Sequence, residues 1–317
     1  MDTLQIAVVD GEGRLEEEVS TGIVPWWSFT KTLIAACVLR LAEDGFVALD
    51  APLAGLPYTP RHLLQHRAGV GNYGGLSEYH EAVARGEEPW SDGEIFARIQ
   101  PDKLLFTPGT GWAYSNVGYL LLRRLIETAC RADLKEALHT LILEPLDLHG
   151  SRIAKSPDDM RMTVFEGGQD YHPGWAFHGI VIGPVAEAAL ALHRLLQGNL
   201  LAPESRATLL QRYDIGGPFA GRPWQTTGYG LGLMMGAMQR SDMAQPIDVV
   251  GHSASGPGSV GAVYCCLHDG RCRTVAAFLA GSHEGDAEYC ALQHLIGSSQ
   301  VTGAGDIRPS SGLCDGF

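Results

Sequence analysis

Two residues near the start of the first strongly helical stretch have side chains that could carry out nucleophilic chemistry. Ser28 and Lys31 are three positions apart, so on a helix both side chains lie on the same face of one turn. A serine hydroxyl is a weak nucleophile, and a lysine one turn away can accept its proton if the lysine pKa is lowered. The start of a helix also carries a positive field that stabilises an oxyanion. Alone, the S-x-x-K pattern is short enough to arise by chance, so a structural role stays open.

A second candidate group is the tripeptide Tyr114-Ser115-Asn116, which follows a Pro-Gly turn and precedes a predicted helix. A phenol held near an ammonium group can titrate low enough to act as a base. Asn116 comes from the same loop and can point toward a substrate amide. Without further context, a loop aromatic such as Tyr114 more often packs on the core.

The third group is a run of small residues at the end of a predicted strand, Gly251-His252-Ser253-Ala254-Ser255-Gly256-Pro257-Gly258. Small side chains allow the backbone to approach a ligand closely. Backbone N–H groups at such an edge can hold an acyl group or form an oxyanion hole.

In this order, the three groups resemble the motifs of the penicillin-recognising serine hydrolases. The Tyr-x-Asn form is similar to the branch that contains class C β-lactamases, D-alanyl-D-alanine carboxypeptidases, D-aminopeptidases and β-lactamase-like esterases. Residues 61–70 (R-H-L-L-Q-H-R-A-G-V) look like the family stretch R-H-L-L-T-H-T-S-G-L, and residues 108–119 match P-G-x-x-x-x-Y-S-N-x-G-Y. Residues 144–146 match its E-P-L turn, and the resemblance as a whole covers about residues 1–297.

The resemblance implies a role for each matching residue. Ser28 would be the acylated nucleophile, and Lys31 its proton acceptor or electrostatic partner. Tyr114 would be the base that activates Ser28 and later the water, and Asn116 would contact the substrate amide.

The small-residue segment implies substrate-binding roles, with departures from the family pattern. His252 stands where the K-T-G motif has its lysine, and a histidine is a weaker, pH-dependent cation, so capture of a carboxylate should suffer. Ser253 and Ser255 would bind substrate, and the N–H groups of Ser28 and Ser255 would form the oxyanion hole. Ala254 replaces the usual glycine, which would add a methyl group beside the substrate channel.

Hydrophobic periodicity predicts strands at both ends of the chain and helices between them. Strands are expected over residues 4–9, 15–24, 228–235, 247–250, 259–267 and 273–280, and helices from Ser28 and over 118–130, 134–143, 185–196, 203–210 and 286–296. With the resemblance, this pattern predicts an α+β protein with the three-layer α-β-α fold of β-lactamases and transpeptidases. Residues 1–51 and 228–297 would form the antiparallel sheet subdomain, residues 52–227 an inserted helical subdomain, and residues 298–317 a flexible tail.

Two other interpretations remain open. Ser253 follows a strand in a near match to the G-x-S-x-G elbow of α/β-hydrolases, but the fifth position is Ser255 and the glycines and proline that follow disfavour the required helix. The chain could also be a relative that has lost turnover and binds peptides or cell-wall fragments. His62 and His66 are four residues apart but lack the glutamate of a zinc-protease helix, so structural roles are expected for them.

Composition excludes several classes of function. The chain has 317 residues, 45% of them hydrophobic, and its formal net charge of −13 argues against nucleic-acid binding. No apolar run is long enough to span a membrane, and the N-terminus lacks the features of a secretory signal, so a cytoplasmic location is expected unless a precursor was trimmed. We expect a small-molecule or peptide substrate, no cofactor and no catalytic metal, and the oligomeric state stays open.

Cysteine usage predicts free thiols in a reducing compartment. The number of cysteines is odd, and none form a C-x-x-C pair. They are Cys37, Cys130, Cys265, Cys266, Cys272, Cys290 and Cys314.

Overall fold

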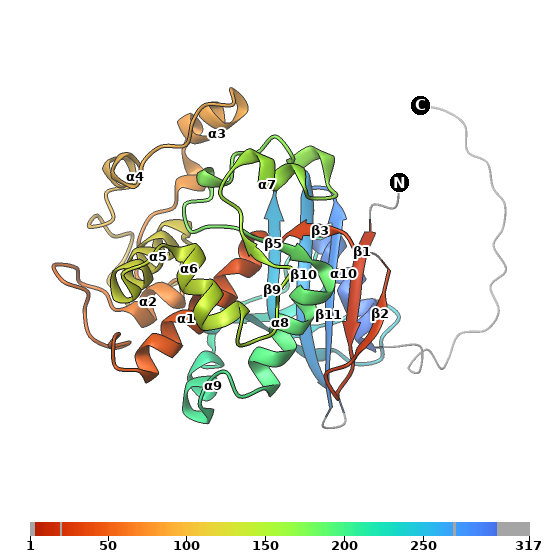
Figure 1. Ribbon diagram of the computed structural model, residues 1–317. Helices are drawn as coiled ribbons and strands as arrows, with labels where there is room; N and C mark the ends of the chain where they lie inside the picture. Colours follow the sequence, from red (N-terminus) through yellow and green to blue (C-terminus); the bar gives the residue numbers. More distant parts are fainter. Residues whose placement is uncertain (1–3, 20, 269–270, 297–317) are drawn as a thin grey trace, which may run out of the picture.

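Eight strands form one antiparallel sheet in which strands from both ends of the chain are neighbours (Figure 1). The computed structural model describes residues 4–19, 21–268 and 271–296. In order across the sheet, the strands are β2 (Leu15–Glu18), β1 (Leu4–Val9), β11 (Arg271–Ala280), β10 (Ser259–His268), β9 (Ile247–Gly256), β8 (Met234–Met238), β7 (Trp224–Tyr229) and β6 (Tyr213–Gly216). β11 pairs with β1 on one side and β10 on the other, which joins the two ends of the described chain.

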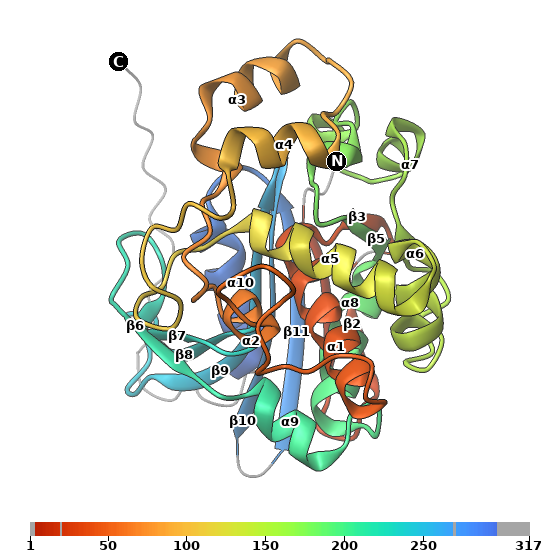
Figure 2. The ribbon, with the colours of Figure 1, turned by 90° about the vertical axis from the view of Figure 1, so that its left-hand side faces the viewer.

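Helices pack on both faces of the sheet. Successive residues of a strand point to opposite faces, and in the central strands the residues on both faces are apolar. On one face, α10 (Glu284–Ile296) covers Ile6, Val8 and Val275. On the other face, α8 (Val185–Gln197) lies against β1, β10 and β11, and α1 (Thr30–Glu43) belongs to the same hydrophobic core (Figure 2). The predicted three-layer α-β-α arrangement is therefore present.

The helical part lies at one end of this sandwich, next to α1. Its helices are α2 (Pro60–Leu64), α3 (Ser77–Ala84), α4 (Asp92–Ile99), α5 (Asn116–Cys130), α6 (Leu134–Leu138), α7 (Pro157–Arg161) and α9 (Pro203–Leu209), with short helical turns η1 (Trp27–Phe29), η2 (Tyr73–Gly75), η3 (His139–Leu143), η4 (Glu166–Gly168) and η5 (Pro173–Trp175). A small second sheet has the order β3 (Ile23–Pro25), β5 (Val181–Pro184) and β4 (Arg152–Ile153). Among the described residues, no helix is both long enough and apolar enough to cross a bilayer.

Several element boundaries differ from the sequence prediction. The expected strand over 15–24 is divided, because β2 pairs with β1 whereas β3 joins the small sheet. The expected strand over 228–235 is the tip of a hairpin between β7 and β8, since Gly232 has a φ of +72° and turns the chain. The large sheet also begins before the expected boundary at residue 228, with β6 and most of β7. The expected tail over 298–317 lies outside the described residues.

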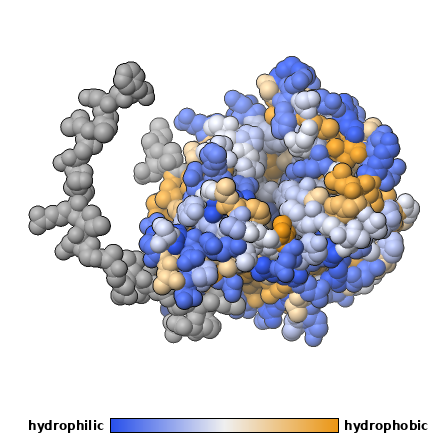
Figure 3. Space-filling model, turned by 180° about the vertical axis from the view of Figure 1, so that it is seen from behind, coloured by the Kyte–Doolittle hydropathy of each residue, from blue (hydrophilic) through white to orange (hydrophobic). Residues whose placement is uncertain are grey.

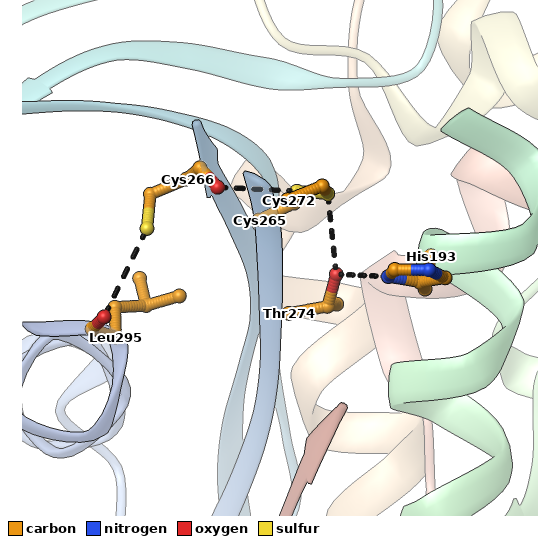
Figure 4. Close-up of a disulfide and its surroundings, with 6 residues drawn as sticks. All are labelled: His193, Cys265, Cys266, Cys272, Thr274 and Leu295. Atoms are coloured by element: carbon orange, nitrogen blue, oxygen red, sulfur yellow. Dashed lines mark hydrogen bonds between the residues drawn. A yellow bond between two sulfur atoms is a disulfide. The ribbon is translucent and has the colours of Figure 1, made fainter. Parts of the chain in front are cut away.

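Two of the cysteines form a disulfide, which corrects the prediction that all thiols are free. The β10–β11 hairpin places Cys265 opposite Thr274 and Leu267 opposite Cys272, so the two cysteines are diagonal neighbours with Cα atoms 6.2 Å apart. That separation is within the reach of a disulfide, and the structure joins them (Figure 4). The sequence showed that Cys265 and Cys272 are seven residues apart, but it did not show the hairpin that brings their sulfur atoms together. Cys37, Cys130, Cys266 and Cys290 are free, and Cys314 lies outside the described residues.

Candidate active site

Ser28 lies in η1, the turn that connects β3 to α1, and its position depends on Trp27. Trp27 has a φ of +40°, a left-handed conformation that is uncommon for a bulky residue. Its indole N–H donates a hydrogen bond to Ser259 Oγ over 2.9 Å. Gly256 lies against the face of the indole, where a Cβ atom would approach the ring to 2.4 Å. Contacts with β9 and β10 therefore hold the turn that presents Ser28.

The structure brings the three predicted catalytic side chains together. Lys31 comes from the first turn of α1, and its Nζ lies 3.2 Å from Ser28 Oγ. Tyr114 comes from the loop before α5, and its phenol donates a hydrogen bond to Ser28 Oγ over 2.9 Å. Asn116, the first residue of α5, lines the cavity beside them. The Ser28 hydroxyl thus has both an amine and a phenol within hydrogen-bond reach.

Burial disfavours the charged form of both partners of Ser28. Lys31 is fully buried, and this desolvation lowers the pKa of its ammonium group well below the ordinary value. Burial raises the pKa of the Tyr114 phenol, and the Glu284 carboxylate adds to the shift although the hydrogen bond with Ser28 opposes it. The Tyr114 pKa is therefore shifted in the direction opposite to the prediction that it titrates low, because desolvation of the phenolate is the largest effect.

Ser28, Tyr114 and Asn116 form part of the wall of a cavity of about 460 Å³, whereas Lys31 is not among its lining residues. Its wall also contains His252, Ser253 and Ser255, so this cavity unites Ser28 and Tyr114 with the predicted substrate-binding residues. A smaller cavity of about 170 Å³ shares Ser28 and Ser255 with it. Seen from behind, the surface of the molecule is hollowed between two lobes (Figure 3).

A family model described as Beta-lactamase matches residues 21–296 of this chain. The chain belongs to the beta-lactamase family. The resemblance drawn from the motifs and the predicted fold are both confirmed.

Among curated proteins, the chain is similar to Esterase EstB of Burkholderia gladioli, with 30% identity over 162 residues. That match covers 45% of this chain and 41% of the esterase, so it spans less than half of either protein.

Solved structures of relatives share the fold over nearly the whole chain. A D-stereospecific amidohydrolase from Streptomyces sp. has a TM-score of 0.71 and 22% identity, covering 90% of this chain and 93% of its own. D-amino acid amidase from Ochrobactrum anthropi SV3 in complex with D-phenylalanine has a TM-score of 0.72 and 17% identity, covering 92% and 90%. At these identities the likeness establishes the fold alone.

In this beta-lactamase family member, the residue at the K-T-G lysine position is part of a buried hydrogen-bond chain. His252 Nε2 lies 2.8 Å from the Tyr229 hydroxyl, which lies 3.2 Å from His66 Nε2. The backbone N–H of Ser115 donates to His66 Nδ1 over 3.1 Å. In neutral His66 the proton is therefore on Nε2 and donates to Tyr229, which in turn donates to His252 Nε2.

The position that corresponds to the K-T-G lysine has no positive charge in this chain, because His252 is neutral. Burial lowers the pKa of His252 to about 3, and neighbouring Lys31 and Arg222 act in the same direction, although its hydrogen bond to the Ser253 backbone opposes the shift. The sequence-based expectation of a pH-dependent cation is thus replaced by a neutral imidazole near pH 7. His66, expected to be structural, supports the Tyr114 loop through its bond to Ser115.

The serines and the alanine of β9 lie in three different environments. The Ser253 hydroxyl is hydrogen-bonded to Glu288, and it lies 2.6 Å from the Tyr264 hydroxyl and 3.1 Å from Arg222 Nη2. Ser255 is exposed and lines both cavities. Ala254 belongs to the hydrophobic core and not to the lining of either cavity, so its methyl group does not narrow them.

His178 is a neighbour of the nucleophile that the sequence analysis did not assign to the catalytic group. Its Nε2 lies 3.0 Å from Lys31 Nζ, and burial lowers its pKa well below the ordinary value. A neutral His178 can accept a hydrogen bond from Lys31 and so orient the amine toward Ser28. Its 147-residue separation from Lys31 left no local signal for this contact.

Proposed function

We propose that the protein is a serine hydrolase that forms an acyl-enzyme on Ser28 with an ester or an amide. The observation that carries this proposal is that Lys31 Nζ and the Tyr114 hydroxyl both lie within hydrogen-bond reach of Ser28 Oγ, and that Ser28 lines a substrate-sized cavity. The names of the similar proteins, an esterase, a D-stereospecific amidohydrolase and a D-amino acid amidase, support the same class of reaction.

Lys31 is the better candidate for the base in the first step. With the amine neutral, Ser28 transfers its proton to Lys31 Nζ as Oγ attacks the substrate carbonyl carbon. Tyr114 is protonated and gives its phenolic proton to the leaving alcohol or amine, and it recovers a proton from the Lys31 ammonium group. The net result is transfer of the Ser28 proton to the leaving group. Attack of water on the acyl-enzyme then uses the same two groups in reverse.

The remaining site residues have binding roles in this proposal. The backbone N–H groups of Ser28 and Ser255 would hold the oxyanion, and Asn116 would contact the substrate amide. Because His252 is neutral and bonded to Tyr229, it offers no cation for a substrate carboxylate. Short-chain esters and D-amino-acid amides therefore precede β-lactams as candidate substrates.

The test is intact-mass spectrometry after the protein is mixed with an activated short-chain ester and, separately, with a penicillin. Transient acylation on the peptide that contains Ser28, absent in Ser28→Ala, is the expected result. An adduct that never clears would favour a protein that binds without turnover. Label on the Ser253 peptide, or identical labelling of Ser28→Ala, would refute the proposed nucleophile.

A further inference from the structure

One wall of the large cavity carries an ion-pair cluster made of Arg222, Glu284 and Glu288. Arg222 and Glu284 both line the cavity with Ser28. Glu288 lies behind them, with its side chain fully buried. Arg222 comes from the turn before β7, whereas both glutamates come from the first two turns of α10.

The positive charge of Arg222 is already neutralised by Glu288. Arg222 Nε donates to Glu288 Oε2 over 2.8 Å, and Nη2 donates to Oε1, so the two side chains form a bidentate pair. The Trp224 indole N–H donates to the same carboxylate over 2.9 Å. These bonds fix the guanidinium toward α10 and leave it poorly suited to take a substrate carboxylate.

Glu284 is a second carboxylate on the same guanidinium. Its Oε2 lies 2.6 Å from Arg222 Nη1, and its side chain retains about a third of its exposure. With both carboxylates ionised, one cation and two carboxylates give this cluster a net charge of −1; burial raises the pKa of Glu284, and the Arg222 guanidinium opposes that shift. Among the described residues that line the cavity, Arg222 is the one arginine or lysine, because Lys31 lies behind Ser28 and does not line it.

We infer that Glu284 makes this cavity select substrates that carry an ammonium group beside the scissile ester or amide bond. The inference rests on the proposed hydrolase function and adds the charge of the substrate to it. A primary or quaternary ammonium would supply a second positive charge to balance the two carboxylates. The aromatic residues Trp112 and Tyr229 line the same cavity, and aromatic rings can attract a cation. Substrates with a carboxylate at this place would be repelled.

This inference can be tested by measuring binding alone, with charged and uncharged ligands of the same shape and without hydrolysis. In the Ser28→Ala protein, titration calorimetry compares alanine p-nitroanilide, as both enantiomers, with isobutyryl p-nitroanilide, in which a methyl group replaces the ammonium group. Butyrylcholine is compared with 3,3-dimethylbutyl butyrate, in which carbon replaces the quaternary nitrogen. These two pairs place the cation on the acyl side and on the leaving-group side, respectively.

The charged member of at least one pair should bind on the order of tenfold more tightly. Adding Glu284→Gln should reduce that ratio to near one. The matched control is Asp286→Asn, which removes the same charge from an exposed position on the same helix and should preserve the ratio. The inference would be overturned by equal binding within both pairs, by tighter binding of the neutral members, or by no binding of any ligand. It would also be overturned if Glu284→Gln left the ratio unchanged.

The wild-type protein tests the hydrolase proposal separately with the same four compounds. Ser28-dependent acylation or product release without a charge preference would retain the hydrolase and reject the role of Glu284. A charge preference in binding without any Ser28 adduct or product would retain the role of Glu284 in ligand selection and reject the hydrolase.

Discussion

The side chains around Ser28 have protonation states determined by burial more than by residue type. Lys31, a strong base in water, is buried so completely that its neutral form is favoured. Tyr114 keeps its proton for the same reason, and His252 remains uncharged. An uncharged amine is a proton acceptor and an uncharged phenol is a donor, so burial assigns the two partners of Ser28 opposite tasks.

Replacing Lys31 tests which partner is the base. Lys31→Arg places a permanently charged guanidinium where a neutral proton acceptor is needed, so Ser28 acylation should slow by roughly 10²- to 10⁴-fold. In the wild type, the acylation rate should fall as pH decreases through the lowered Lys31 pKa, because the ammonium form cannot accept a proton. Rates of adduct formation measured by mass spectrometry against pH provide the check. Lys155→Arg, at an exposed ion pair, is the control.

If Lys31→Arg acylates within a few-fold of the wild-type rate, Lys31 is not the base. Tyr114 would then have to take that role despite its raised pKa.

Ser253→Ala distinguishes a structural hydroxyl from a nucleophile. The hydroxyl contributes to the buried network around Glu288, so its loss should reduce the free energy of unfolding by about 1–3 kcal/mol. Ser28 acylation should persist within several-fold of the wild-type rate. Urea unfolding measures the first effect and peptide mapping the second. Normal stability combined with complete loss of acylation would support the alternative in which Ser253 is the nucleophile.

At the scale of elements, the site depends on three segments that meet at one turn. η1 presents Ser28, α1 supplies Lys31 from its first turn, and the loop before α5 supplies Tyr114. β9 holds η1 in place through the contact between Gly256 and Trp27. The small-residue segment of β9 therefore serves packing against η1 as well as the cavity wall.

Gly256→Ala should damage activity through geometry. The added methyl group would overlap the Trp27 ring and displace the turn that carries Ser28. A displacement of about 1 Å at a reacting atom costs on the order of 10²-fold in rate, and we expect a loss of that size in Ser28 acylation. Gly75→Ala is the matched control, because its Cβ would meet no atom within 4 Å. Equal rates for the two variants would show that Trp27 does not position the nucleophile.

At the scale of the whole molecule, the sheet unites the two ends of the chain and the helical part closes over it. The cavity lies where these parts meet, since its lining residues come from η1, the α5 loop, β7, β9 and α10. The same closure buries His66, His178 and His252 as neutral groups. Their neutrality links the stability of the fold to pH.

Acid should destabilise the protein from about pH 6.5 downward. The pKa of His252 is about 3 in the folded protein, compared with an ordinary value of 6.5. Between pH 3 and pH 6.5, the unfolded chain therefore binds a proton at this residue that the folded chain does not bind. Stability is therefore full above that window and falls as pH decreases through it, by about 1.4 kcal/mol per pH unit for this group. Urea unfolding at pH 7, 6 and 5 measures the slope.

His252→Gln should make that slope shallower by about one proton, whereas His283→Gln, at an exposed position, should not change it. Identical slopes for the wild type and His252→Gln would show that His252 is charged or accessible in the folded protein.

The sequence alone was sufficient for the family, the layered fold and the grouping of Ser28, Lys31, Tyr114 and Asn116. Helical spacing puts Ser28 and Lys31 on one turn regardless of what surrounds them, and alternating apolar residues predict the strands from local order. Local order could not show where a hairpin turns, so the β7–β8 turn and the Cys265–Cys272 pair were missed.

Long-range packing decided the remaining features of the site. His178 meets Lys31, Tyr229 bonds to His252, and Glu284 joins Arg222 because segments far apart in the chain cross at the cavity. The direction of the Tyr114 pKa shift also depends on this packing, since a phenol responds to the desolvation and charges of its surroundings. Residue types and spacing specify which groups are available for chemistry, whereas burial by distant segments determines which of them carry charge.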